Sequence, residues 1–245
     1  MTATIRPPAG ARELKVADPA VRLREYESAF AFYLTLIGGN LLDNIVFVEN
    51  SQSDLQPLMA RCAGHPRGEA VEFLSFNGLD YPPHFGRGYG EFRLLDHAMQ
   101  NSKVLASLHP TDHVWKVTGR YIVSNLSSMI RTAPRDYEFY CDLKTRPRPW
   151  MDLRLFSFTP TCYKRLLLGI YPELSEADGR PAAEVAVRKV IAAHLDEKQI
   201  VPRFRREPKV EGVRGYDGRS YSSGRNRLKY VARAVSRRII PGLWI

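Results

Sequence analysis

Three glycines at alternate positions form the most distinctive cluster in this chain of 245 residues. They belong to a run that leads into a helix predicted over Phe92–Gln100, namely Gly86, Arg87, Gly88, Tyr89, Gly90 and Glu91. Glycine lets backbone approach a ligand closely, and a helix N-terminus attracts anions. The run therefore predicts a loop that binds a phosphate-type anion. A tight turn with solvated charges is the alternative, because the spacing matches neither the dinucleotide motif nor the phosphate loop.

Two further polar runs follow predicted strands. Glu49, Asn50 and Ser51 end the strand predicted over Asp43–Glu49, and their carboxylate and amide groups suit a ribose or a base. The second run contains Lys116, Gly119 and Arg120. It belongs to the strand predicted over Val114–Val123, whose strand-like part Trp115–Tyr121 ends on Gly119, Arg120 and Tyr121. A guanidinium binds phosphate through two parallel hydrogen bonds, so Arg120 is the predicted diphosphate ligand. The alternatives are a capped turn at Glu49 and a surface ion pair at Arg120.

A carboxylate near the predicted anion site could act as a general base, the group that removes a proton from a reacting hydroxyl. Asp152 and Glu91 are the predicted catalytic residues, with Asp142 and Glu184 as weaker candidates. Glu91 has an alternative role at the start of a helix, where acidic side chains often bond backbone N–H groups. We predict no metal site, because the six histidines and three cysteines show no ligand spacing.

Segments rich in β-branched and aromatic residues alternate with segments of helical spacing, which predicts an α/β domain with a mostly parallel sheet. The predicted strands are Arg12–Ala17, Asp43–Glu49, Val71–Phe76, Val114–Val123 and the pair Tyr137–Leu143 and Leu153–Phe158, which we expect to be antiparallel. The predicted helices are Arg22–Leu36, Asp54–Cys62, Phe92–Gln100, Pro160–Leu168 and Pro181–His194. Ligands of parallel sheets bind beyond the carboxyl ends of the strands, so the three polar runs are expected to share one pocket.

The basic charge is concentrated at the C-terminal end of the chain. Residues 203–245 hold 12 Lys or Arg and 3 Asp or Glu, whereas residues 1–202 hold 24 and 23. We expect residues 1–202 to form the ligand-binding domain and residues 203–245 to form a basic tail. In that tail Val210–Gly224 is a predicted linker, and Asn226–Ile240 is a predicted amphipathic helix followed by Leu243, Trp244 and Ile245. An anionic membrane surface is the expected partner of the tail, and nucleic acid is not. The alternative is that the helix packs on the α/β body and that Trp244 fills a gap in the core.

Composition narrows the class of protein further. An apolar fraction of 44% suffices for a core and excludes wholesale disorder. Scattered cysteines indicate a reducing compartment, and the longest apolar stretch is shorter than the ~20 residues of a membrane span. We expect a cytoplasmic protein, placed in the cytosol or on the cytosolic face of a membrane.

Taken together, the runs Ile45–Ser51, Gly86–Ala98, Lys116–Tyr121 and Asp152–Phe158 resemble small bacterial glycosyltransferases of capsule and lipopolysaccharide synthesis. The resemblance covers roughly Arg22 to His194. It implies a GT-A-like, Rossmann-like fold, a nucleotide-sugar donor and a glycan or lipid-linked acceptor, on the cytosolic face of the inner membrane. Many GT-A enzymes carry an Asp-x-Asp that holds a divalent cation, and this chain has none. We therefore expect transfer without a metal cofactor, although isolated carboxylates remain able to hold Mg²⁺. The alternatives are a non-catalytic relative that binds glycan or a partner, and a basic protein associated with nucleic acid.

Overall fold

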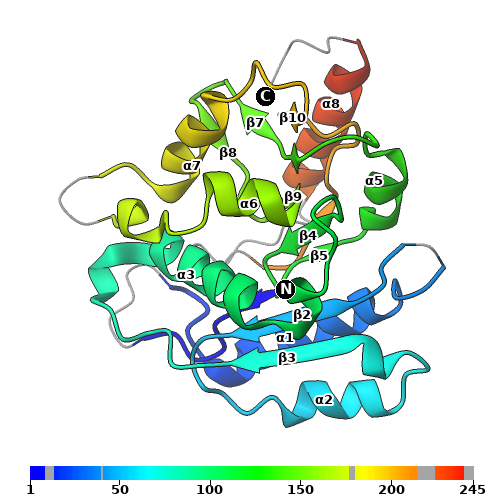
Figure 1. Ribbon diagram of the computed structural model, residues 1–245, viewed down its shortest axis with the longest axis vertical. Helices are drawn as coiled ribbons and strands as arrows, with labels where there is room; N and C mark the ends of the chain where they lie inside the picture. The colour runs from blue at the N-terminus through cyan, green and yellow to red at the C-terminus, as the bar shows by residue number, and fades with distance from the viewer. Residues whose placement is uncertain (9–13, 40, 177–179, 214–223, 240–245) are drawn as a thin grey trace.

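The computed structural model describes residues 1–8, 14–39, 41–176, 180–213 and 224–239, and it is an α/β structure. Strands and helices alternate through the first half of the chain (Figure 1). In order they are β1 (Thr2–Ala3), α1 (Pro19–Leu34), β2 (Ile45–Glu49), α2 (Gln56–Ala63), β3 (Val71–Ser75), α3 (Gly86–Asn101), α4 (Lys103–Ala106) and β4 (Val114–Val117).

Shorter elements make up the second half. They are β5 (Ile122–Val123), α5 (Leu126–Thr132), β6 (Phe139–Tyr140), β7 (Leu143–Lys144), β8 (Trp150–Met151), β9 (Leu155–Phe158), α6 (Pro160–Leu166), α7 (Ala183–Ala192), β10 (Ile200–Val201), β11 (Val210–Glu211) and α8 (Gly224–Ile239). Three short 3-10 helices also occur, at Gly68–Ala70, Pro83–Phe85 and Tyr171–Leu174.

The first sheet is wholly parallel, in the order β1-β2-β3. β1 is its short inner strand, because Thr2 pairs with Val48 on one side and forms a parallel bridge to Thr118 on the other. Thr118 directly follows β4, so β1 connects the parallel sheet to the second sheet. The chain moves outward from β1 to β2 and β3 and then returns to the opposite side of β1. The strand order therefore reverses between β1 and β4.

The second sheet is mixed, in the order β10-β6-β9-β4. β9 runs antiparallel to both β4 and β6, whereas β10 and β6 are parallel. The expected antiparallel pairing of Tyr137–Leu143 with Leu153–Phe158 is confirmed for β6 and β9. Figure 1 shows the parallel sheet at one end of the molecule and the mixed sheet towards the other.

Helices cover both faces of these sheets. Because successive side chains of a strand point to opposite faces, Tyr140 and Leu155 pack in one hydrophobic cluster and their neighbours Phe139 and Phe156 in the other. The first cluster includes Phe30 of α1, and the second includes side chains of α3, α6 and α7. The mixed sheet is thus buried on both faces, which explains the apolar runs of its strands.

Local sequence signals place the helix ends. Asp18 caps α1 by accepting a hydrogen bond from the N–H of Ala20 at 2.8 Å, and Pro19 occupies the first helical turn. Thr159 caps α6 in the same manner through the N–H of Cys162 at 3.2 Å. These caps stabilise the helices that cover the two clusters.

Several predicted elements differ from the structure. Leu14–Ala17, the described part of the strand predicted over Arg12–Ala17, forms no strand, and β1 is its unpredicted counterpart. The strand predicted over Val114–Val123 is interrupted by the bridge at Thr118 and a turn, which separate β4 from β5.

The predicted linker begins as ordered structure, because β11 pairs antiparallel with β5. Residues 214–223 of that linker and the terminal Leu243, Trp244 and Ile245 lie outside the described residues. Phe204 is 1% exposed and its ring lies 4.8 Å from that of Tyr140, so the chain beyond residue 202 packs against the body.

Candidate functional site

A cleft of about 1320 Å³ lies where the strand order reverses. Thr2, Ala3 and Thr4 line it from β1 and the residue beyond, and Thr118 and Arg120 line it from the carboxyl end of β4. In α/β sheets this is the place where strand ends diverge and leave room for a ligand. Further walls come from α1, from the start of α3, from residues 150–154 around β8, from the start of α7, from residues 207–211 and from α8.

The glycine-rich run is not the loop that its sequence predicts. Gly86, with φ of +84°, ends the 3-10 helix Pro83–Phe85, and Gly86–Glu91 forms the first turns of α3. Close packing explains the two following glycines. A Cβ on Gly88 would lie 2.1 Å from the Cβ of Ala183 in α7, and one on Gly90 would lie 2.1 Å from the hydroxyl of Tyr81.

The structure still brings most of this run to the cleft. Gly86, Arg87, Gly88, Gly90 and Glu91 line it. Tyr89 is not among the lining residues, and its ring instead packs against Tyr81, Phe85 and Tyr171, with centroids 4.6 to 5.0 Å away. The predicted anion-binding role stays a prediction, now for a helix start rather than for a loop.

Glu91 and Lys116 form an ion pair at the base of the cleft. The Lys116 side chain is 1% exposed, and its ammonium also donates to the carbonyl of Leu153 at 2.5 Å. Thr2 and Thr118 donate their hydroxyls to the same Glu91 oxygen, Oε1, at 3.1 and 3.0 Å. Lys116 does not line the cleft, and its contacts join β4, α3 and the residues before β9.

Arg120 lines the cleft and is also bound within the protein. Its guanidinium donates to Glu25 Oε2 at 2.7 Å, to the hydroxyl of Tyr121 at 3.1 Å and to the carbonyl of Val213 at 3.2 Å. The neighbouring Gly119 permits the junction of the sheets, since a Cβ there would lie 2.7 Å from the carbonyl oxygen of Thr2. Gly119 itself is not among the lining residues.

The run after β2 is not brought to the cleft: Glu49, Asn50 and Ser51 are absent from its lining. The Glu49 carboxylate is fully buried and accepts the N–H groups of Ile5, Ser51 and Ser53 at 2.9 to 3.2 Å. Asn50 accepts the hydroxyl of Thr4 at 2.7 Å. These bonds order the turn after β2, which is the alternative that the sequence left open.

Asp152 lines the cleft beside Arg154. Arg154 donates from Nε to Oδ1 at 2.8 Å and from Nη2 to Oδ2 at 2.5 Å. Burial alone would raise the pKa of Asp152, but Arg154 outweighs this effect and lowers the pKa below its ordinary value. Asp152 is therefore an ionised and firmly held carboxylate.

Glu184, in the first turn of α7, lies on another wall of the cleft. Burial raises its pKa, and the nearby carboxylates Glu91 and Glu176 act in the same direction, while Arg87 opposes them. A carboxyl group with a raised pKa accepts a proton more readily near neutral pH than an ordinary one. The structure thus places the sequence's weaker candidate in the environment best suited to proton transfer.

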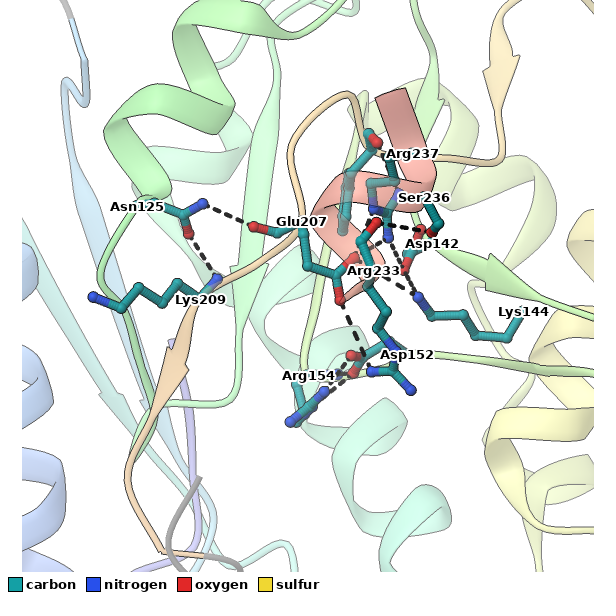
Figure 2. A network of polar contacts seen from close by, with 11 residues as sticks. Asn125, Asp142, Lys144, Asp152, Arg154, Glu207, Lys209, Arg233, Ser236 and Arg237 are labelled. Atoms are coloured by element: carbon teal, nitrogen blue, oxygen red, sulfur yellow. Dashed lines mark hydrogen bonds and ion pairs between the residues drawn. The ribbon is translucent and has the colours of Figure 1, made fainter. Parts of the chain in front are cut away.

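A cluster of buried charges beside the wall formed by α8 was not predicted as a cluster (Figure 2). One of its members, Asp142, was a weaker candidate for the catalytic base, but it is not among the residues that line the cleft. Lys144 and Glu207 line the cleft, and the Lys144 ammonium lies 2.5 Å from Asp142 Oδ2. Arg237 of α8 donates to Asp142 Oδ2 at 2.7 Å and to Glu207 Oε2 at 2.6 Å. Asn125 holds the chain around Glu207 by two backbone hydrogen bonds of 2.8 Å. No spacing signal identifies this cluster, because its members come from distant segments of the chain.

Within the described residues, no group of three or more His, Cys, Asp or Glu side chains is arranged to hold a metal ion. None of the described helices has the length and apolar character needed to cross a membrane. Comparison of the chain with family models, with curated proteins and with solved structures finds no match.

Proposed function

We propose that this chain is a glycosyltransferase that moves a sugar from a nucleotide-sugar donor to a glycan or lipid-linked acceptor in bacterial surface polysaccharide synthesis. The observation that carries the proposal is the position of the cleft at the reversal of strand order, beyond the carboxyl ends of β1 and β4. A parallel sheet followed by a mixed one, with helices on both faces, also agrees with a GT-A-like fold.

In this proposal the donor diphosphate binds near the start of α3. Arg87 and Arg120 line this part of the cleft, and the first turn of α3 supplies N–H groups and a favourable dipole. Arginine charge replaces a divalent cation, which makes transfer independent of metal. Arg120 would have to share its guanidinium between Glu25 and the phosphate.

Six carboxylates line the cleft, and the candidates for the general base in this proposal are three of them: Glu91, Asp152 and Glu184. The hydroxyls of Thr2 and Thr118 and the ammonium of Lys116 all contact Glu91 through Oε1, and no described residue hydrogen-bonds to its Oε2. That oxygen and the Glu184 carboxyl are suited to accept the proton of an acceptor hydroxyl.

A panel of nucleotides and nucleotide sugars tests donor binding through thermal shift. A donor that binds the folded state raises the melting temperature. Arg87→Ala should weaken that binding by about 1.5–3 kcal/mol, because a charged hydrogen bond to phosphate is lost. Arg67→Ala, which changes an exposed arginine outside the cleft, is the matched control. A panel of UDP, GDP, CMP and their sugars that leaves the melting temperature unchanged would contradict the proposal.

A non-catalytic relative that binds glycan is the second candidate. The observation in its favour is that both predicted catalytic carboxylates, Asp152 and Glu91, are ion-paired within the protein. Donor binding without either transfer or hydrolysis of the donor would favour this second candidate.

A further inference from the structure

Helix α8 packs on the body through its charged side. Arg237 has a side chain that is 6% exposed, and it donates to Asp142, to Glu207 and to the carbonyl of Phe204 at 2.8 Å. Arg233, one turn earlier, lies 3.8 Å from Glu207 Oε1. Figure 2 shows these side chains reaching from α8 into the cluster of acidic groups. The polar side of the helix is therefore its attached side.

The apolar side of α8 faces solvent. Leu228, Val231, Val235 and Ile239 are 73%, 55%, 47% and 72% exposed. They recur at intervals of three and four residues, which places them on one face of the helix. Arg233 and Arg237 lie two residues from Val235, about 200° around the helix axis from it. A helix on the surface of a soluble protein normally has the reverse orientation, with its apolar face towards the core.

The charge of α8 indicates which kind of surface can cover this apolar face. Its sequence contains six Lys or Arg and no Asp or Glu. Two copies of the helix placed face to face would bring like charges together. An anionic lipid surface instead accepts apolar side chains into the interface and attracts a helix whose sequence carries an excess of positive charge. Besides the paired Arg233 and Arg237, that sequence contains four more Lys or Arg.

We propose that α8 attaches the protein to an anionic lipid bilayer, with Leu228, Val231, Val235 and Ile239 inserted at the interface. Tyr230, Val231 and Arg233 also line the cleft, so attachment places the cleft beside the lipid surface. This position suits a lipid-linked acceptor, a consequence that rests on the proposed function. The attachment itself does not depend on it.

Co-sedimentation with vesicles tests the attachment, using the full chain without donor. We expect binding to vesicles of equal parts phosphatidylcholine and phosphatidylglycerol at low salt, and much weaker binding to pure phosphatidylcholine. High salt should weaken the binding, because it screens the charges. The double variant Leu228→Ser/Ile239→Ser should bind roughly tenfold or more weakly, because two apolar side chains no longer enter the interface.

The control is Leu168→Ser/Leu195→Ser, which changes two exposed leucines outside α8, each 39% exposed. This variant should bind the anionic vesicles as the unchanged protein does. Circular dichroism should show the same melting temperature for the α8 variant and the unchanged protein, because Leu228 and Ile239 contact solvent.

Three results would overturn the proposal. The first is no binding to anionic vesicles at low salt, and the second is binding by the α8 double variant that equals that of the unchanged protein. The third is that the unchanged protein is a dimer in solution whereas the α8 double variant is a monomer. Failure of the donor panel with vesicle binding intact would count against the proposed function alone.

Discussion

The carboxylates of the cleft differ in their environments more than in their sequence contexts. Asp152 is held ionised by Arg154, whose guanidinium bonds both oxygens. Glu184 is half-buried, and its pKa is raised. An ionised carboxylate with a low pKa is a weak base, whereas one with a raised pKa accepts protons more readily. Under the proposed function, this difference assigns the positioning of groups to Asp152 and the transfer of a proton to Glu184.

Replacement of Glu184 should separate activity from stability. Because the folded protein favours the protonated form of Glu184, its contribution to stability is present below pH 4.5 and is lost as pH rises through the raised folded pKa. Glu184→Gln mimics the protonated form, so the variant should be at least as stable at neutral pH. If Glu184 is the base, turnover should fall about 10²–10⁴-fold.

The measurements are urea denaturation and the pH dependence of transfer. If the unchanged protein catalyses the proposed transfer with Glu184 as the base, the rate should rise with pH as Glu184 loses its proton. Asp152→Asn is the comparison, since it removes a carboxylate that is already ionised and held by Arg154. Full turnover in Glu184→Gln would assign the base to another residue.

At the scale of elements, the contact between α3 and α7 depends on a residue without a side chain. Gly88 brings α3 against Ala183 at the start of α7. Gly88→Val should therefore destabilise the protein by about 1–3 kcal/mol through overpacking, rather than act on ligand binding alone.

A double-mutant cycle checks that mechanism. Gly88→Ala adds the Cβ that would meet Ala183, and Ala183→Gly removes the atom that it meets. If the clash is the cause, Ala183→Gly should recover part of the stability lost in Gly88→Ala. Strict additivity of the two free-energy changes in urea denaturation would show that the contact is not responsible.

The longer helices and strands were predictable from the sequence because they depend on local patterns of apolar residues. The helix predicted over Arg22–Leu36 and the strand predicted over Asp43–Glu49 correspond to α1 and β2. β1 was not predictable, since two residues carry no periodicity and pair only through tertiary structure. The glycine run was recognised, but its cause was not, because Gly88 packs against Ala183, which lies 95 residues further along the chain.

The site was predictable only in part, for the same reason. Arg120 was a candidate because it lies near the end of a predicted strand, and it does line the cleft. The same reasoning made Glu49 a candidate, but its carboxylate accepts hydrogen bonds from backbone N–H groups instead. Lys144 and Glu207 became visible only when the fold brought them to the α8 wall. Sequence spacing cannot reveal pairs that are far apart along the chain.

At the scale of the whole molecule, α8 is held to the body by buried charges. Arg237→Ala would leave Asp142 and Glu207 without their closest partner from α8. Loss of one member of a buried ion pair typically costs about 3–5 kcal/mol, so we expect a large loss of stability or detachment of α8. Arg233→Ala is the matched control, because Arg233 is 35% exposed and should contribute less than about 1 kcal/mol.

Urea denaturation measures the loss of stability. The rate at which limited proteolysis cleaves peptide bonds within α8 measures detachment of that helix. Equal effects of the two arginine substitutions would mean that burial of the Arg237 pair does not hold the helix. Rapid cleavage confined to α8 in Arg237→Ala would show that the helix detaches while the rest of the fold remains intact.

The central position of β1 has a consequence for how the chain folds. Thr2 pairs with Val48 and Thr118, which lie 46 and 116 residues further along the chain. β1 is synthesised before every other strand described here, yet its pairing is completed only after β4 has emerged. Until then the inner strands keep open edges, which can pair with other chains. Contacts between residues that lie so far apart in the sequence also slow folding. Synthesis and refolding are therefore the stages at which this protein is most prone to aggregate.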